Sequence, residues 1–193
     1  MISALILAAG ESKRMGQPKL LLPWRQSTVL GHVIQVFKSA AIEDVVVVTG
    51  GRREAVEEIA RAGGARLAFN RDFASQEMLS SLQTGLRCME LSTQAALVAL
   101  GDQPQVEEST VRMVAEEYRR TFAPLIVPSY EMHRGHPWLI ARKFWDAVLA
   151  MRFPETPRDF LHGSARDIVY VELASPTILQ DLDTPEDYLN SRQ

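Results

Sequence analysis

The sequence predicts a three-layer α/β/α fold with a mostly parallel, twisted sheet. Apolar runs alternate with amphipathic segments along most of the chain, and runs such as "DVVVVTG" (44–50) and "AALVALGD" (95–102) are apolar at almost every position. Continuous apolar strands separated by helices are typical of a parallel sheet covered on both faces. No composition break, repeat or low-complexity tract interrupts the pattern, so we expect one domain over residues 1–193.

Hydrophobic periodicity assigns the strands of this sheet. We predict strands at 2–8, 44–50, 65–70, 95–102, 124–130, 135–141, 168–173 and 177–183. In a strand over 177–183, a period of two would point the carboxylates of Asp181 and Asp183 to the same side.

Segments between the strands carry apolar residues at helical spacing and recognisable boundary signals. Pro185, for example, directly follows Thr184 where the last helix is expected to begin. We predict helices at 28–40, 52–63, 76–91, 108–122, 142–151 and 184–191, and a proline-interrupted loop with one helical turn over 152–167. With right-handed crossovers this is a Rossmann-like arrangement, in which ligands bind beyond the carboxyl ends of the strands.

Composition narrows the classes of partner. A net charge of −3 does not indicate a broad surface for nucleic acid or an anionic membrane. No apolar run approaches the roughly 20 residues that span a bilayer, and the N-terminus lacks the charged region of a signal peptide. The single cysteine, Cys88, excludes an intramolecular disulfide and fits a cytoplasmic protein; we expect it to be buried on a helix.

The stretch "LAAGESKRMGQPK" (7–19) directly follows the first predicted strand. It matches neither the dinucleotide fingerprint G-x-G-x-x-G nor the Walker A spacing. Its small residues Ala8, Ala9 and Gly10 would let a triphosphate lie against backbone N–H groups. Arg14 offers a planar fork for phosphate, and Lys19 offers a point charge. The alternative is a solvated loop whose cations bind nothing.

This opening stretch resembles the motif L-A-A-G-x-S-x-R-M-G-x-x-K of the MobA-like nucleotidyltransferases, most closely the molybdenum cofactor cytidylyltransferases. Further landmarks of that family follow in order, at "NRDFASQEMLSSLQTG" (70–85), "GDQP" (101–104), "RGHP" (134–137) and "DLDTPEDY" (181–188). The resemblance covers essentially the whole chain. It implies the nucleotide-diphospho-sugar transferase type of Rossmann-like fold.

Asp102 follows a buried predicted strand, where a carboxylate can hold Mg²⁺ against a phosphate. The resemblance implies that Asp102 binds the metal, Mg²⁺ or Mn²⁺, and that Asp183 or Asp181 completes the site. The alternatives are a turn cap at Asp102 and a helix N-cap at Asp183 or Thr184.

Ser80 and Ser81 lie in the early turns of a predicted helix, where hydroxyl and N–H groups suit a base or ribose; ordinary capping is the alternative. The resemblance implies that both serines meet the base and that Asn70 enters the same pocket. It implies a catalytic set of Arg14, Lys19 and Asp102, and a nucleotide-binding set of Leu7, Ala8, Ala9, Gly10, Arg14, Lys19, Asn70, Ser80, Ser81 and Asp102.

The second substrate is implied to face the loop Arg134, Gly135, His136 and Pro137, together with Arg166. His133 and His136 have a spacing that metal sites use, but no Cys or further His lies near them in the sequence. "LHGSARD" (161–167) departs from the G-D-x-G-A-R that the family usually carries, which bears on the acceptor more than on the nucleotide. A strand-entry turn and a surface arginine are the alternatives.

The resemblance implies transfer of CMP from CTP to a phosphate monoester, the molybdopterin cofactor, with release of pyrophosphate. It leaves open a guanylyltransferase, a sugar-1-phosphate nucleotidyltransferase of the same fold, and a non-catalytic molybdenum cofactor chaperone. A client molybdoenzyme is a further expected partner; nucleic acid and membranes are not. No strong general base is required, because a phosphate monoester is already nucleophilic at neutral pH.

Overall fold

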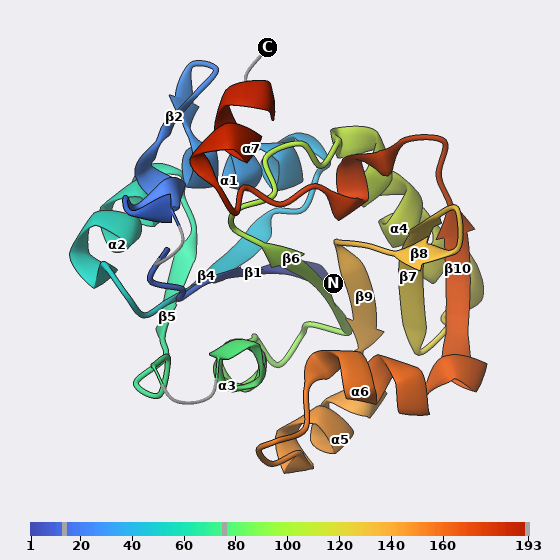
Figure 1. The fold of residues 1–193 in the computed structure, drawn as a ribbon. Coiled ribbons are helices and arrows are strands. Elements are labelled where there is room, and N and C mark those ends of the chain that lie inside the picture. Colours follow the sequence, from blue (N-terminus) through green and yellow to red (C-terminus); the bar gives the residue numbers. More distant parts are fainter. Residues whose placement is uncertain (13–14, 75–76, 192–193) are drawn as a thin grey trace.

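An eight-stranded mixed sheet forms the centre of the protein (Figure 1). The computed structural model describes residues 1–12, 15–74 and 77–191. The strand order is β10-β7-β9-β6-β1-β4-β5, and β8 pairs with β7. The strands are β1 (Ile2–Ala8), β4 (Asp44–Thr49), β5 (Arg66–Phe69), β6 (Ala95–Leu100), β7 (Leu125–Tyr130), β8 (His133–Arg134), β9 (Trp138–Ala141) and β10 (Ile168–Glu172).

Most neighbouring strands run parallel, as predicted. β5, β4, β1 and β6 form one parallel block, and β7 pairs in parallel with β10. β9 runs antiparallel between β6 and β7, and β8 is antiparallel to β7. Because β9 is reversed, the residues that precede it lie at the same edge as the carboxyl ends of the parallel strands. Together with the helix layers described next, this sheet confirms the predicted three-layer α/β/α fold.

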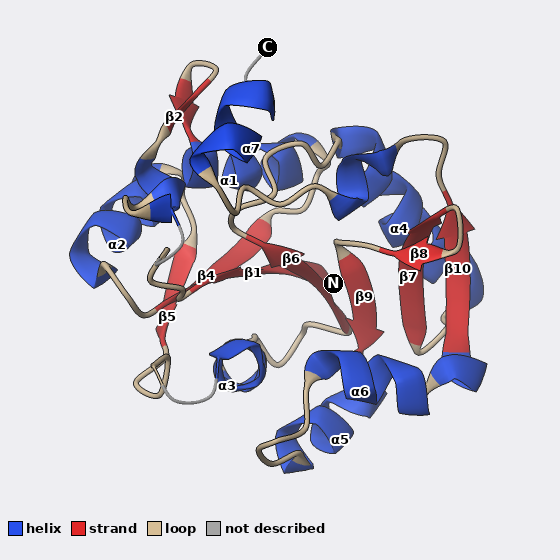
Figure 2. Cartoon of the chain, in the orientation of Figure 1, coloured by secondary structure: helices blue, strands red, loops and turns tan. Residues whose placement is uncertain are grey.

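Helices cover both faces of this sheet (Figure 2). One layer holds α1 (Val29–Ser39), α2 (Arg53–Ala62) and α4 (Glu108–Thr121); the other holds α3 (Glu77–Arg87), α5 (Trp145–Ala150) and α6 (Pro157–Gly163). Short 3-10 turns occupy η2 (Lys19–Leu21), η3 (Arg142–Phe144), η4 (Ala165–Asp167) and η5 (Pro176–Leu179), and α7 (Pro185–Ser191) ends the described chain. None of the helices in the described ranges is apolar over a length that could cross a membrane.

The sheet separates two apolar cores. Successive residues of β1 point to opposite faces, so Ala4 and Ile6 belong to one core, and Leu5 and Leu7 belong to the other. All four are buried. The apolar run at the start of the sequence is thus explained by burial on both faces.

Two sequence predictions were wrong, and one short hairpin was not predicted. Residues 177–183 do not form a strand: Pro176 lacks an N–H and opens η5, whose turn the Ser175 hydroxyl caps by accepting from the Thr177 N–H at 3.4 Å. Cys88 follows the end of α3 and is exposed, not buried on a helix. The short hairpin of β2 (Pro23–Trp24) and β3 (Ser27–Thr28) was not predicted, because two-residue strands carry too little periodicity.

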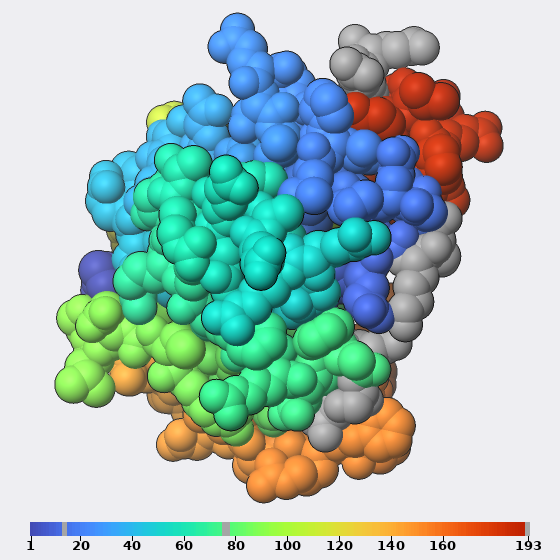
Figure 3. All heavy atoms as spheres, turned by 90° about the vertical axis from the view of Figure 1, so that its left-hand side faces the viewer, coloured from blue at the N-terminus to red at the C-terminus, as the bar shows by residue number. Residues whose placement is uncertain are grey.

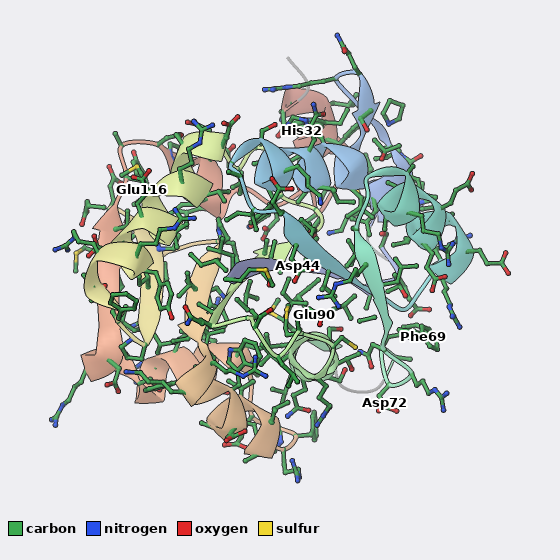
Figure 4. The ribbon with its side chains drawn as sticks, turned by 180° about the vertical axis from the view of Figure 1, so that it is seen from behind. His32, Asp44, Phe69, Asp72, Glu90 and Glu116 are labelled. Carbon is green, nitrogen blue, oxygen red and sulfur yellow. The ribbon has the colours of Figure 1, made fainter. Side chains whose placement is uncertain are left out.

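Ion pairs reinforce the sheet at both ends. At the amino ends of β4 and β5, the Arg66 guanidinium donates to both carboxylate oxygens of Asp44, at 2.8 and 3.0 Å, and lies 3.5 Å from Glu90. Figure 4 shows Asp44 and Glu90 near each other on this side. At the other end of β4, the buried carboxylate of Glu57 accepts from Arg53 at 2.6 Å and from Arg61 at 2.7 Å.

We predict that Glu57→Gln destabilises the protein by about 1–3 kcal/mol at pH 7, because two guanidinium groups lose a buried anionic partner. The hydrogen bond from Arg53, with that from Arg61 and the charges of both arginines, outweighs burial and lowers the pKa of Glu57. A carboxyl group whose folded pKa is lowered stabilises the fold above its unfolded pKa, near 4.3, and loses this contribution as pH falls through the folded pKa.

Urea unfolding from pH 7 down to pH 3 measures this effect. The difference between wild type and Glu57→Gln should shrink below about pH 4. The exposed neighbour Glu58 supplies the matched control, Glu58→Gln, which should leave stability unchanged. A constant difference across the whole pH range would contradict the prediction.

Candidate active site

A cavity of about 420 Å³ opens at the carboxyl ends of β1 and β6. It is lined by Leu7, Ala8, Ala9, Gly10, Glu11, Ser12, Met15, Lys19, Leu20, Phe73, Ala74, Met78, Ser81, Leu100, Asp102 and Asp183. The space-filling view in Figure 3 faces this side of the molecule, where the blue segment after β1 lies between the green helix α3 and the red C-terminal helix. The cavity has the volume of a typical small-ligand site.

The backbone around the end of β1 is tightly packed. Gly51 donates to the carbonyl of Ala9 at 2.9 Å, and Gly101 donates to the carbonyl of Leu7 at 2.9 Å. A Cβ on Gly50 would lie 2.8 Å from the Cβ of Ala9, so that glycine is required by packing. Gly10 differs: a Cβ there would meet no atom within 4 Å. The fold itself does not require a glycine at position 10, which lines the cavity.

Lys19 lies between two carboxylates that come from distant parts of the sequence. Its ammonium forms an ion pair with Asp102, which follows β6, and a second one with Asp183 at 3.1 Å. The side chain of Lys19 is 15% exposed. Burial by itself lowers the pKa of Lys19, but the charges and hydrogen bonds of the two carboxylates outweigh burial and raise it. Lys19 therefore carries its positive charge at neutral pH.

The same carboxylates have the donor chemistry of a divalent-metal site. Mg²⁺ and Mn²⁺ prefer carboxylate oxygens, and Mg²⁺ is usually bound through one or two of them together with substrate phosphates. Asp102 and Asp183 already converge on one cation, the ammonium of Lys19. In the described ranges no group of three or more His, Cys, Asp and Glu side chains is placed to bind a metal. The two carboxylates fit a divalent metal whose other ligands are oxygens of a substrate phosphate.

Asn70 lies beneath the wall of the cavity and holds two serine side chains there by hydrogen bonds. It is 1% exposed, and its amide N–H₂ donates to the hydroxyls of Ser80, at 2.8 Å, and Ser81, at 3.0 Å. Its carbonyl oxygen accepts from the backbone of Asp72 at 3.0 Å. Of these residues, Ser81 lines the cavity, whereas Asn70 and Ser80 lie beneath its wall.

The loop 134–137 lies beside the cavity and does not line it. Val98 on β6 pairs antiparallel with Trp138 on β9, so the residues before Trp138 run alongside the end of β6. Burial lowers the pKa of His136 to about 4, although the charge of Asp102 acts in the opposite direction. His136 is therefore neutral at pH 7. The bond between His136 and Pro137 is cis.

The structure separates the predicted acceptor residues. Arg134 donates through Nε to the Tyr170 hydroxyl at 2.9 Å, and its guanidinium lies 5.6 Å from the centre of that ring. Arg166 lies in η4, directly before the amino end of β10, and is exposed. Since β10 runs parallel to β7, this is the edge of the sheet opposite the cavity. Arg166 therefore lies away from the cavity and from Arg134, and its acceptor-binding role stays a prediction from the resemblance.

Several lining residues were not singled out from the sequence. Glu11 and Ser12 follow Gly10 within the opening motif, and Phe73 and Met78 flank the start of α3. Gln103, next to Asp102, was also passed over; its place in "GDQP" is the signal that could have found it. Arg14, predicted to be catalytic and to bind the nucleotide, lies outside the described residues.

Comparison with known proteins gives a family match over most of the chain. Residues 4–168 match the family described as the MobA-like NTP transferase domain. The molybdenum cofactor cytidylyltransferase of Escherichia coli (strain K12) is 29% identical over 196 residues, covering 100% of this chain and 96% of that protein. The nicotine blue oxidoreductase of Paenarthrobacter nicotinovorans is 28% identical over 193 residues, covering 96% of this chain and 93% of that protein.

A solved structure with a bound metal is also similar. The crystal structure of Rv0371c from Mycobacterium tuberculosis H37Rv in complex with manganese superposes with a TM-score of 0.79 at 27% identity, covering 99% of this chain and 97% of that one. The whole fold, including the segment beyond residue 168 that carries Asp183, is therefore shared with that protein.

We predict that Gly135→Ala destabilises the protein and displaces the segment that leads to Asp183. A Cβ on Gly135 would lie 2.6 Å from both the Cβ and the carbonyl oxygen of Ile178. That backbone cannot yield without moving, so we expect a loss of about 1–3 kcal/mol in thermal or urea unfolding. Gly163→Ala is the matched control, because its Cβ would meet nothing within 4 Å. Equal stabilities of the two variants would refute the prediction.

Proposed function

Because the chain belongs to the MobA-like NTP transferase family and is a nucleotidyltransferase, we propose that it transfers CMP from CTP to molybdopterin, a phosphate monoester. The full-length similarity to a molybdenum cofactor cytidylyltransferase supports CTP and this acceptor. The observation that carries the proposal is the meeting of Lys19, Asp102 and Asp183 at a cavity whose floor is the opening motif.

The proposed reaction forms one phosphorus–oxygen bond and breaks another. An oxygen of the acceptor phosphate attacks the α-phosphorus of CTP, and the bond from that phosphorus to the α–β bridging oxygen breaks. Pyrophosphate leaves with the electron pair of the broken bond. No proton needs to be removed from the attacking phosphate oxygen, which explains how the site can work with a neutral His136 and without a strong base.

The residues of the cavity would bind and orient the triphosphate. Gly10 leaves room for a phosphate to approach the backbone, since its Cβ position is open to the cavity. Lys19 supplies the positive charge for the leaving phosphates, and we assign the same task to Arg14 from the motif alone. Ser81 faces the space beside them, held by Asn70, and is our candidate for contact with the nucleoside.

Asp102 and Asp183 are the residues that would hold Mg²⁺ or Mn²⁺. When bound, the metal supplies charge neutralisation at the phosphate oxygens. Binding of metal and phosphates together requires Lys19 to leave its place between the two carboxylates, and the phosphates offer its ammonium a new anionic partner. The protein thus keeps both carboxylates paired before the substrate arrives.

The acceptor would enter beside the loop 134–137, which lies next to Asp102 and outside the nucleotide cavity. Arg134 is the candidate for its phosphate, after exchange of its contact with Tyr170. We further propose a client molybdoenzyme, a cytoplasmic location consistent with a single cysteine, and one domain over residues 1–193, since Asp183 from beyond residue 168 completes the site.

The alternatives differ in nucleotide, acceptor or turnover, so one assay separates them. We expect pyrophosphate release with Mg²⁺, CTP and molybdopterin, and little release with ATP, GTP or UTP. Release with GTP would indicate guanylyl transfer, and release with a sugar 1-phosphate in place of molybdopterin would replace the acceptor. Binding of CTP and molybdopterin without any pyrophosphate release would indicate a chaperone.

We predict that Lys19→Met lowers kcat/KM by roughly 100- to 1,000-fold, because a charge placed for the developing phosphate charge is lost. Lys143→Met, at an exposed position on η3, is the control with the same chemical change and should retain full activity. Steady-state pyrophosphate release measures both variants. A Lys19→Met enzyme with unchanged kcat/KM would exclude the proposed role.

A further inference from the structure

We propose that Gln103 is a positioning residue that fastens residues 180–182 onto the loop after β6 and so keeps Asp183 within reach of Asp102. The consequence for metal binding rests on the function proposed above, whereas the fastening itself does not. Gln103 donates through its amide Nε2 to Asp181 Oδ1 at 2.6 Å. Directly beside this bond, the Leu182 N–H donates to the carbonyl of Asp102 at 3.3 Å.

Gln103 is a polar side chain in a buried position that does not satisfy its amide oxygen. The residue is 3% exposed, and its Oε1 atom has no hydrogen-bond partner in the part of the chain that the structure describes. A buried polar atom without a hydrogen-bond partner destabilises the folded protein. A well-packed apolar side chain would avoid that cost. Unlike an apolar side chain, the amide can donate a hydrogen bond to Asp181.

The segment needs such a fastening because its own charges oppose its position. Asp102 and Asp183 both contact Lys19, and Asp181 is two residues from Asp183 and bonded to the neighbour of Asp102, so three carboxylates share one small region. Like charges repel, and this repulsion favours release of the segment into solvent. The amide of Gln103 offsets this repulsion at Asp181, as Lys19 does at Asp183.

The geometry of the chain explains why the bond controls Asp183. Upstream, Ile178 is fully buried, and its carbonyl accepts from His136 at 3.3 Å. Downstream, Tyr188 on α7 donates its hydroxyl to the carbonyl of Pro23 at 2.6 Å. Asp183 comes two residues after Asp181, and two residues span at most about 7 Å. An anchor at Asp181 therefore limits Asp183 to the neighbourhood of Lys19.

The same loop offers a matched control. Gln105 has the same side chain, also donates through Nε2 to the C-terminal segment, at Ser191 Oγ (3.0 Å), and also has a buried Oε1 without a partner in the described residues. Its contact lies on α7, beyond Asp183. Gln103→Met and Gln105→Met therefore remove equivalent hydrogen bonds on the two sides of the carboxylate.

Two measurements test the proposal on the intact chain. Hydrogen exchange, read on peptides that contain the Leu182 amide, should be faster in Gln103→Met and unchanged there in Gln105→Met. Binding of Mn²⁺ with CTP, without acceptor and followed by electron paramagnetic resonance, should weaken roughly 10- to 100-fold in Gln103→Met alone, as is typical for residues that support a metal ligand.

A rescue variant separates positioning from general stability. Asp181→Asn combined with Gln103→Glu exchanges donor and acceptor and keeps the net charge of wild type, so both exchange and Mn²⁺ binding should return close to wild type. Gln103→Glu alone places two carboxylates together and should release the segment most strongly.

Unchanged exchange at Leu182 in Gln103→Met would overturn the proposal, as would equal weakening of Mn²⁺ binding in Gln105→Met. Faster exchange with unaltered Mn²⁺ binding would show that the bond does not serve the metal ligand and would also overturn it. If wild type binds no Mn²⁺ with CTP, the proposed function fails, and the exchange measurement still decides whether Gln103 fastens the segment.

Discussion

The ammonium of Lys19, held between Asp102 and Asp183, is the interaction on which the rest of the site depends. It joins the loop after the first strand, the loop after β6 and a segment close to the C-terminus. Without this cation, two carboxylates would face each other at low exposure, which is unfavourable. These two ion pairs hold three distant segments together. Their charges suit the ligands proposed above, an anion at Lys19 and a divalent cation at the carboxylates.

The direction of the strands brings the loops that carry Lys19 and Asp102 to the same edge of the sheet. Parallel strands place their carboxyl ends at one edge, so the loops after β1 and β6 become neighbours. Because β9 runs in the reverse direction, the loop 134–137 that precedes it lies at that same edge. The segment before β10, which contains Arg166, lies at the opposite edge. The cavity proposed for the nucleotide and the loop proposed to face the acceptor therefore lie side by side at one edge. The proposed transfer between two anionic substrates needs cations between their phosphates, which otherwise repel each other.

The irregular segment 178–183 is held in place by contacts with loops and not by strand pairing. Residues 178–183 have no ladder of hydrogen bonds, yet they are fixed by Gly135, which lets Ile178 approach closely, by Gln103, and by the main chain of Asp102. Each of these contacts comes from a loop at the carboxyl edge. The loops that we propose to bind the substrates therefore also hold the segment that carries Asp183.

The sequence by itself determined the layer structure. Strands that are buried on both faces need continuous apolar runs, and β1, β4 and β6 have them. The helices between them are recognised by apolar residues that recur about every 3.6 positions. It also placed Lys19 in the loop region after the first strand and Asp102 just after another strand, and the parallel fold brings these two positions to one edge. Only the tertiary structure decided the rest. That Asp183 pairs with Lys19, that Asn70 lies behind Ser81, and that Arg166 is remote all depend on contacts between distant segments. No local periodicity encodes such contacts, since they arise from strand order and from close packing at single residues such as Gly135.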